Sequence, residues 1–209
     1  MNSEFPIHRP ADNPFASHRV EKLAYRCDRS SVAELARRIP ELGGRAAIVG
    51  GEGSGKTTLL HELAAVLPGD SVHVCILGSC RRPWLAARAQ LPRPVQPNHV
   101  VLVDGAEQLG PVGWHLLLRA ARPARCLVAT LHRPGRLPTL FECRTDQRLL
   151  RDLVSELTPA NPLDLELEDR YRRHGGNIRL CFRELYDLFA GRPSPANLTE
   201  TDGSHGPQC

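Results

Sequence analysis

Short apolar runs alternate with helical segments through the middle of the chain, and this alternation constrains the fold most strongly. The expected strands read RAAIVGG, SVHVCILG, HVVLVDG, CLVATLH and TLFECRT, and they begin at residues 45, 71, 99, 126 and 139. Helix-forming segments lie between them, including TTLLHELAAVL and GWHLLLRAAR. Continuously apolar strands that alternate with helices are typical of a parallel sheet covered on both faces. We therefore predict an α/β fold with a five-stranded parallel sheet between helices.

The sequence before and after this region does not alternate between strands and helices. SVAELARRIPEL, residues 31–42, predicts a helix that ends at Gly43-Gly44. After Asp146 the sequence becomes entirely helical, and its last residues have the composition of a disordered end. We expect four regions: a flexible arm over 1–12, an α/β core over 13–146, a small helical lid over 147–191 and a disordered tail over 192–209.

The bulk composition excludes several classes of protein. The seven cysteines among 209 residues are scattered and form no CxxC, which argues against a disulfide framework or a zinc site. The beginning of the chain has no apolar signal region, and no run approaches the roughly 20 apolar residues that span a bilayer. A cytoplasmic protein without a membrane span is expected. The net charge of +4 does not by itself indicate a nucleic-acid partner.

The strongest motif is GGEGSGKT, which matches G-x-x-x-x-G-K-[ST] between an expected strand and an expected helix. Glycines allow backbone N–H groups to point into one concavity, and the helix N-terminus adds its positive dipole end. We expect Lys56 to reach the β- and γ-phosphates of a nucleotide and the Thr57 hydroxyl to bind Mg²⁺. The predicted phosphate-binding residues are Gly50, Gly51, Glu52, Gly53, Ser54, Gly55, Lys56, Thr57 and Thr58.

A second magnesium ligand is predicted downstream. Asp104 closes the apolar strand HVVLVD, where its carboxylate would face the phosphate pocket. The alternative is an aspartate that only caps the helix after the strand.

Together these features resemble a P-loop NTPase of the ASCE division, and most closely the AAA+ group, especially compact ATPases of secretion and transposition systems. The similarity includes NPF at 13–15, Tyr25 and the helix from Ser31, and it covers roughly residues 13–190. It implies a sheet order of 5-1-4-3-2, ATP and Mg²⁺ as ligands and a possible homo-oligomer. No NKxD-type guanine reader is present. The sequence identifies no protein partner, and a nucleic-acid role follows by analogy only.

The catalytic residues depart from the family pattern. The resemblance implies a glutamate directly after Asp104, where this sequence has Gly105. Glu107 is the candidate to orient the attacking water, and its alternative role is that of a first-turn glutamate favoured by the helix dipole. Thr130 fits the family's polar sensor or is an ordinary strand threonine. His132 is an alternative contact to the γ-phosphate.

Arginines supply the remaining candidates. HGGNIRLCFRELYDLF resembles the second sensor region of AAA+ lids, with Arg179 as the sensor. Otherwise Arg179 is a solvated residue on a helix whose buried face is Ile178, Phe182, Leu185 and Phe189. Arg133 and Arg136 occupy the loop where the family often has an arginine finger that acts on a neighbouring subunit, or they are simply exposed.

Three functions remain open at this point. The first is a slow or partner-stimulated ATPase that acts as a regulatory switch. The second is a nucleotide-binding scaffold without turnover, which Gly105 favours. The third is a small-molecule kinase with an arginine-rich lid formed by Arg170, Arg172 and Arg173.

Overall fold

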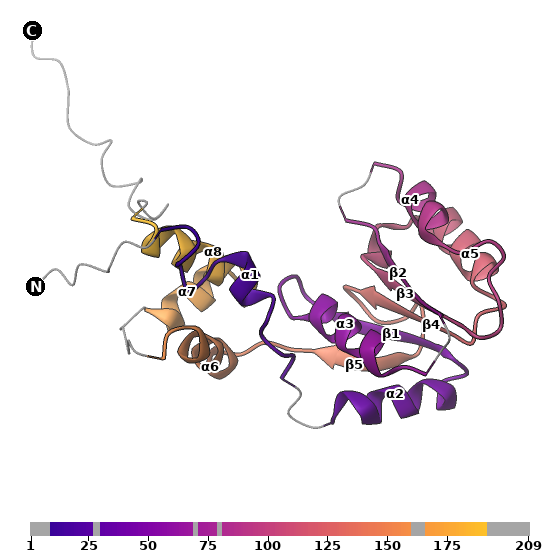
Figure 1. The fold of residues 1–209 in the computed structure, drawn as a ribbon, viewed down its shortest axis with the longest axis horizontal. Coiled ribbons are helices and arrows are strands. Elements are labelled where there is room, and N and C mark those ends of the chain that lie inside the picture. The colour runs from indigo at the N-terminus through magenta and orange to yellow at the C-terminus, as the bar shows by residue number, and fades with distance from the viewer. Residues whose placement is uncertain (1–8, 27–29, 69–70, 79–80, 160–165, 192–209) are drawn as a thin grey trace, which may run out of the picture. The chain divides into compact units, whose positions relative to one another are not determined.

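The structure is a computed structural model that describes residues 9–26, 30–68, 71–78, 81–159 and 166–191. The chain divides into two compact units, shown in Figure 1. Ala24–Arg144 is the α/β unit, and Met1–Leu23 together with Thr145–Cys209 is the helical unit. Most of the expected arm over 1–12 and all of the expected tail over 192–209 lie outside the described residues.

The α/β unit contains a five-stranded sheet in which every pair of neighbours is parallel. Its strands are β1 (Arg45–Gly50), β2 (Ser71–Ile76), β3 (His99–Asp104), β4 (Cys126–Leu131) and β5 (Thr139–Cys143). The order across the sheet is β2-β3-β4-β1-β5, which reads 5-1-4-3-2 from the opposite edge. The predicted α/β class and the parallel sheet are confirmed, and all five apolar runs form strands.

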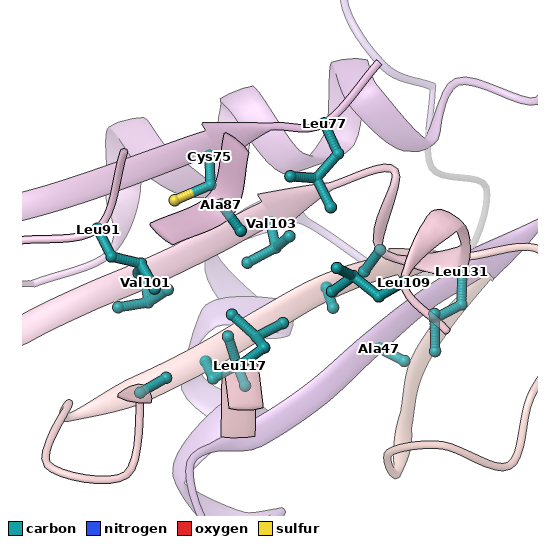
Figure 2. Packing of buried hydrophobic residues seen from close by; sticks show 14 of the residues in the cluster. Ala47, Cys75, Leu77, Ala87, Leu91, Val101, Val103, Leu109, Leu117 and Leu131 are labelled. Atoms are coloured by element: carbon teal, nitrogen blue, oxygen red, sulfur yellow. The ribbon is translucent and has the colours of Figure 1, made fainter. Parts of the chain in front are cut away.

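Helices cover both faces of this sheet (Figure 1). The helices of the unit are α2 (Val32–Glu41), α3 (Lys56–Val66), α4 (Pro83–Gln90), α5 (Pro111–Ala120) and the short 3₁₀ helix η1 (Ala106–Gln108). Alternate residues of the central strands point to opposite faces. Ile48 and Leu102 pack with α2 and α3, whereas Val101 and Val103 pack with α4 and α5. Figure 2 shows the second of these clusters. Burial on both faces explains why the central strands β1, β3 and β4 are mainly apolar.

The helical unit combines segments from the two ends of the chain. Its helices are α1 (Ser17–Val20), α6 (Gln147–Leu157), α7 (Leu167–Arg173) and α8 (Ile178–Phe189). The Phe15 ring lies 5.8 Å from that of Phe182 and 5.3 Å from that of Phe189. The buried Asn13 amide donates to the Tyr186 carbonyl at 2.9 Å. The segment from Asn13 to Leu23, which the sequence assigned to the core over 13–146, therefore packs with the C-terminal helices instead.

A buried carboxylate joins α7 to α8. Glu184 is 6 % exposed, and its Oε1 accepts from the buried Arg170 guanidinium. Arg173 donates to the same oxygen at 2.9 Å, and His174 Nε2 lies 2.7 Å from Oε2. Arg170 and Arg173, which the sequence placed in a predicted lid, thus take part in the packing of the helical unit.

Among the helices within the described ranges, none combines the length and apolar character that crossing a bilayer requires.

Candidate functional site

The glycine-rich loop joins the end of β1 to the start of α3, and its backbone leaves no room for larger residues at two positions. A Cβ on Gly50 would lie 2.6 Å from both the Cys143 carbonyl oxygen and Ser54 Oγ. A Cβ on Gly55, where φ is +85°, would lie 2.9 Å from the Tyr25 ring. Contacts under 3.0 Å require the surroundings to shift. A Cβ at Gly51 would meet only open space, so the loop is packed against protein at Gly50 and Gly55 and is accessible at Gly51.

The remaining loop residues differ in their exposure to solvent. Ser54 is buried and donates from Oγ to the Gly51 carbonyl at 2.8 Å, which fixes the loop. Glu52 is exposed, and Gly53 is half-buried with φ of +68°. Thr58 is half-buried on the first turn of α3. The residues from Gly50 to Thr58 form one continuous strand-to-helix turn.

Lys56 is buried at the start of α3 and folds back over the loop. Its Nζ donates to the Gly50 carbonyl at 2.8 Å and to the Gly51 carbonyl at 2.6 Å. Desolvation lowers the pKa of Lys56, and the charges of Glu107, Cys143, Asp104 and Glu52 oppose that decrease. The ammonium is therefore held by neutral carbonyls in a place that penalises its charge. An anionic ligand would relieve that penalty.

Three polar side chains from α3, β3 and β4 meet at the carboxyl ends of the strands. Thr57 Oγ1 donates to Asp104 Oδ2 at 2.9 Å, and Thr130 Oγ1 donates to Asp104 Oδ1 at 2.8 Å. The Gly105 N–H donates to Thr130 Oγ1 at 2.8 Å. Thr130 is fully buried. Asp104 thus holds two hydroxyl groups, and η1 after it has no side-chain cap. Simple helix capping does not describe this aspartate.

The chemistry of these oxygens suits magnesium. Mg²⁺ prefers one or two carboxylates together with substrate phosphates and water, rather than a cage built from protein alone. Asp104 and Thr57 offer one carboxylate and one hydroxyl beside the glycine loop. Within the described residues there is no group of three or more His, Cys, Asp or Glu side chains that could hold a metal. A magnesium ion here would take its other ligands from phosphate and solvent.

Glu107 lies on η1, where the sequence predicted the start of an ordinary helix. Gly105 has φ of +78°, which turns the chain sharply after β3. Glu107 Oε1 lies 3.1 Å from His132 Nε2, and Glu107 Oε2 is buried without a hydrogen-bond partner in the described part of the chain. Sequence reasoning named both residues but missed that they pair. The available signal was that each follows the end of one of two predicted neighbouring strands.

The arginine candidates have different surroundings. Arg179 is exposed on α8 in the helical unit, and the predicted buried face of that helix is confirmed. Arg136 donates to the carbonyls of Ala106 and Leu109 at 3.3 and 2.9 Å and stacks 5.2 Å from the Trp114 ring centroid. Arg136 and Arg133 are both exposed, and Arg136 is bound to its own α/β unit. The site residues that meet by direct contact all belong to Ala24–Arg144.

Comparison of the sequence with models of known protein families and with curated proteins found no match, so the functional argument depends on the residues of the site.

Proposed function

We propose that the α/β unit binds ATP with Mg²⁺, with the phosphates in the loop from Gly50 to Thr58, as an AAA+-like P-loop protein. The observation that carries this proposal is the contact of Thr57 and Thr130 with the two oxygens of Asp104, next to a loop closed by glycines. Lys56 binds the β- and γ-phosphates by exchanging its two carbonyl partners for phosphate oxygens. Thr57 and Asp104 hold the magnesium ion, and Thr130 senses the γ-phosphate.

The proposed activity is slow or partner-stimulated ATP hydrolysis that serves as a regulatory switch. Glu107 orients the attacking water, in place of the glutamate that the AAA+ pattern has directly after the magnesium aspartate. Support comes from its charge, which opposes the pKa decrease of Lys56 more than any other charge. Arg179 is the proposed lid sensor, which would couple the nucleotide state to the helical unit. Assembly as a homo-oligomer and an unidentified protein partner belong to the same proposal.

Of the two alternatives, the scaffold without turnover has a specific observation in its favour, since Gly105 occupies the family's glutamate position. The kinase alternative has less support. Arg170 and Arg173 pair with Glu184, and Arg172 pairs with Glu168 and Asp169, so these arginines already have carboxylate partners.

The proposal is tested first by magnesium dependence. In Asp104→Asn the side chain keeps its shape but loses its charge, so affinity for ATP with Mg²⁺ is expected to fall about 10- to 100-fold. Affinity for ATP in excess EDTA should not change, because the phosphate-binding loop is intact. Titration calorimetry on the full chain measures both values. Equal magnesium dependence in the variant and the parent would contradict the assignment of Asp104.

Moving a glutamate to position 105 provides a second test. Gly105→Glu places a glutamate where the AAA+ pattern has one, yet we expect it to distort the turn and lower any turnover. An L-residue with left-handed backbone costs about 1–2 kcal/mol, and a Cβ at this φ of +78° would also lie 3.2 Å from Gln108 Nε2. The turn that carries Glu107 should shift, and any turnover should fall by about 100-fold.

Urea denaturation and a phosphate-release assay measure the two effects of this change. Gly105→Asn is the matched control, because asparagine tolerates the left-handed region better than glutamate does. Faster turnover in Gly105→Glu than in the parent would show that Glu107 is not the water-orienting residue.

A further inference from the structure

The two oxygens of Glu107 are used differently. Oε1 lies 3.1 Å from His132 Nε2, within ion-pair distance. Oε2 is enclosed by protein and has no hydrogen-bond partner among the residues that the structure describes. A buried polar atom left without a partner costs about 1–3 kcal/mol, so such an atom points to a donor supplied from outside the protein.

The fold brings this pair to the predicted nucleotide site. β3 and β4 are parallel neighbours, so both strands end at the same edge of the sheet. Asp104 ends β3 and Glu107 follows three residues later on η1, while Thr130 belongs to the end of β4 and His132 comes two residues after it. The Thr130–Asp104 contact and the His132–Glu107 contact thus link the same two strand ends.

The pair contributes little to the stability of the fold. The side chains of His132 and Glu107 are 40 % and 25 % exposed, and partly exposed ion pairs are worth about 0–1 kcal/mol. The left-handed turn at Gly105 and the three-residue η1 helix aim Glu107 back toward the strand ends, rather than along a solvent-facing helix. The geometry is that of a carboxylate oriented by a second side chain.

We propose that His132 is a positioning residue that holds Glu107 through Oε1, so that Oε2 accepts a hydrogen bond from the water that attacks ATP. This inference rests on the proposed ATP site. The water oxygen forms a bond to the γ-phosphorus, and the bond from that phosphorus to the bridging oxygen of ADP breaks. Glu107 accepts the proton of the water and releases it with the phosphate product, so ADP and inorganic phosphate leave and the carboxylate is restored.

Three variants of the full chain separate this role from a structural one. His132→Ala removes the imidazole that contacts Oε1, His132→Gln retains a polar N–H group at that position, and Glu107→Gln keeps the shape of the carboxylate without its charge. His115→Ala is the matched control, because His115 is an exposed histidine on α5 of the same unit. Steady-state phosphate release gives kcat, and titration of ATP with Mg²⁺ gives the affinity. The second readout is the gain in ADP affinity on adding aluminium fluoride, which mimics the transferring phosphoryl group.

His132→Ala is expected to lower kcat by about 100-fold and to remove most of the aluminium fluoride gain, while ATP and ADP affinities stay within about twofold. His132→Gln should recover part of both losses, and His115→Ala should behave as the parent. Because His132 acts through Glu107, the double variant of His132→Ala and Glu107→Gln should be no slower than Glu107→Gln alone.

Parental kcat and aluminium fluoride gain in His132→Ala would overturn the inference, and so would multiplicative losses in the double variant. A parent protein that binds ATP but shows neither turnover nor an aluminium fluoride gain would overturn it too and favour the scaffold. No ATP binding by the parent would instead refute the proposed function itself.

Discussion

Lys56→Ala is expected to weaken the binding of ATP with Mg²⁺ by about 100-fold or more. The buried ammonium donates to the carbonyls of Gly50 and Gly51, and phosphate oxygens would replace them with charge-assisted hydrogen bonds. A hydrogen bond to a charged group contributes about 1.5–3 kcal/mol, and every 1.4 kcal/mol is a tenfold change in affinity. Titration calorimetry on the full chain measures this loss.

The apo protein should not lose stability in a matched Lys56→Met variant. Methionine retains most of the packing of the lysine stem and removes the charge whose burial lowers the pKa of Lys56. Lys22, the only other lysine, is exposed in the helical unit, and Lys22→Ala is the control for the loss of one positive charge. Unchanged ATP affinity in Lys56→Ala would refute phosphate binding by this loop.

The second large effect is expected in the helical unit. Glu184→Ala removes the carboxylate that joins Arg170, Arg173 and His174, and it leaves the buried Arg170 charge without that partner. Breaking a buried ion pair by removing one member costs about 3–5 kcal/mol of unfolding free energy. Urea denaturation of the full chain, followed by far-ultraviolet circular dichroism, should show an early loss of helix.

Glu168→Ala is the control for this variant, because Glu168 forms an exposed pair with Arg172 on α7. It should not shift the urea transition measurably. A Glu184→Ala transition that coincides with that of the parent would mean that packing of the apolar face of α8 alone holds α7 in place.

The sequence predicted the sheet well because the required information is local. Each central strand is a run of mainly apolar residues bounded by glycine or polar residues, because it is buried on both faces. The glycine loop was also predicted, because the spacing of its glycines matches a known motif. The structure gives the reason for two of these glycines, since a Cβ at Gly50 or Gly55 would meet atoms of the protein itself. The placement of Asp104 followed from its position at the end of an apolar strand.

The parts that the sequence did not predict depend on contacts between distant segments. Nothing in the sequence around Asn13 or Phe15 shows that they pack against α8, more than 160 residues further on. The pairing of Glu107 with His132 required the left-handed turn at Gly105, and glycine permits that conformation without demanding it. The pairing of Arg170 with Glu184 depends on how α7 and α8 cross. Side-chain partners of this kind leave no periodic pattern in a sequence.

The strand order has a consequence for synthesis on the ribosome. β1 lies between β4 and β5, and both of these follow α5 in the chain. A nascent chain that has emerged only through α5 contains the whole glycine loop but neither neighbour of the strand that leads into it. The contacts of Asp104 with Thr57 and Thr130 span 47 and 26 residues, and the second also awaits β4. Because contacts between distant residues form late, the proposed nucleotide pocket should be among the last parts of the unit to assemble during translation.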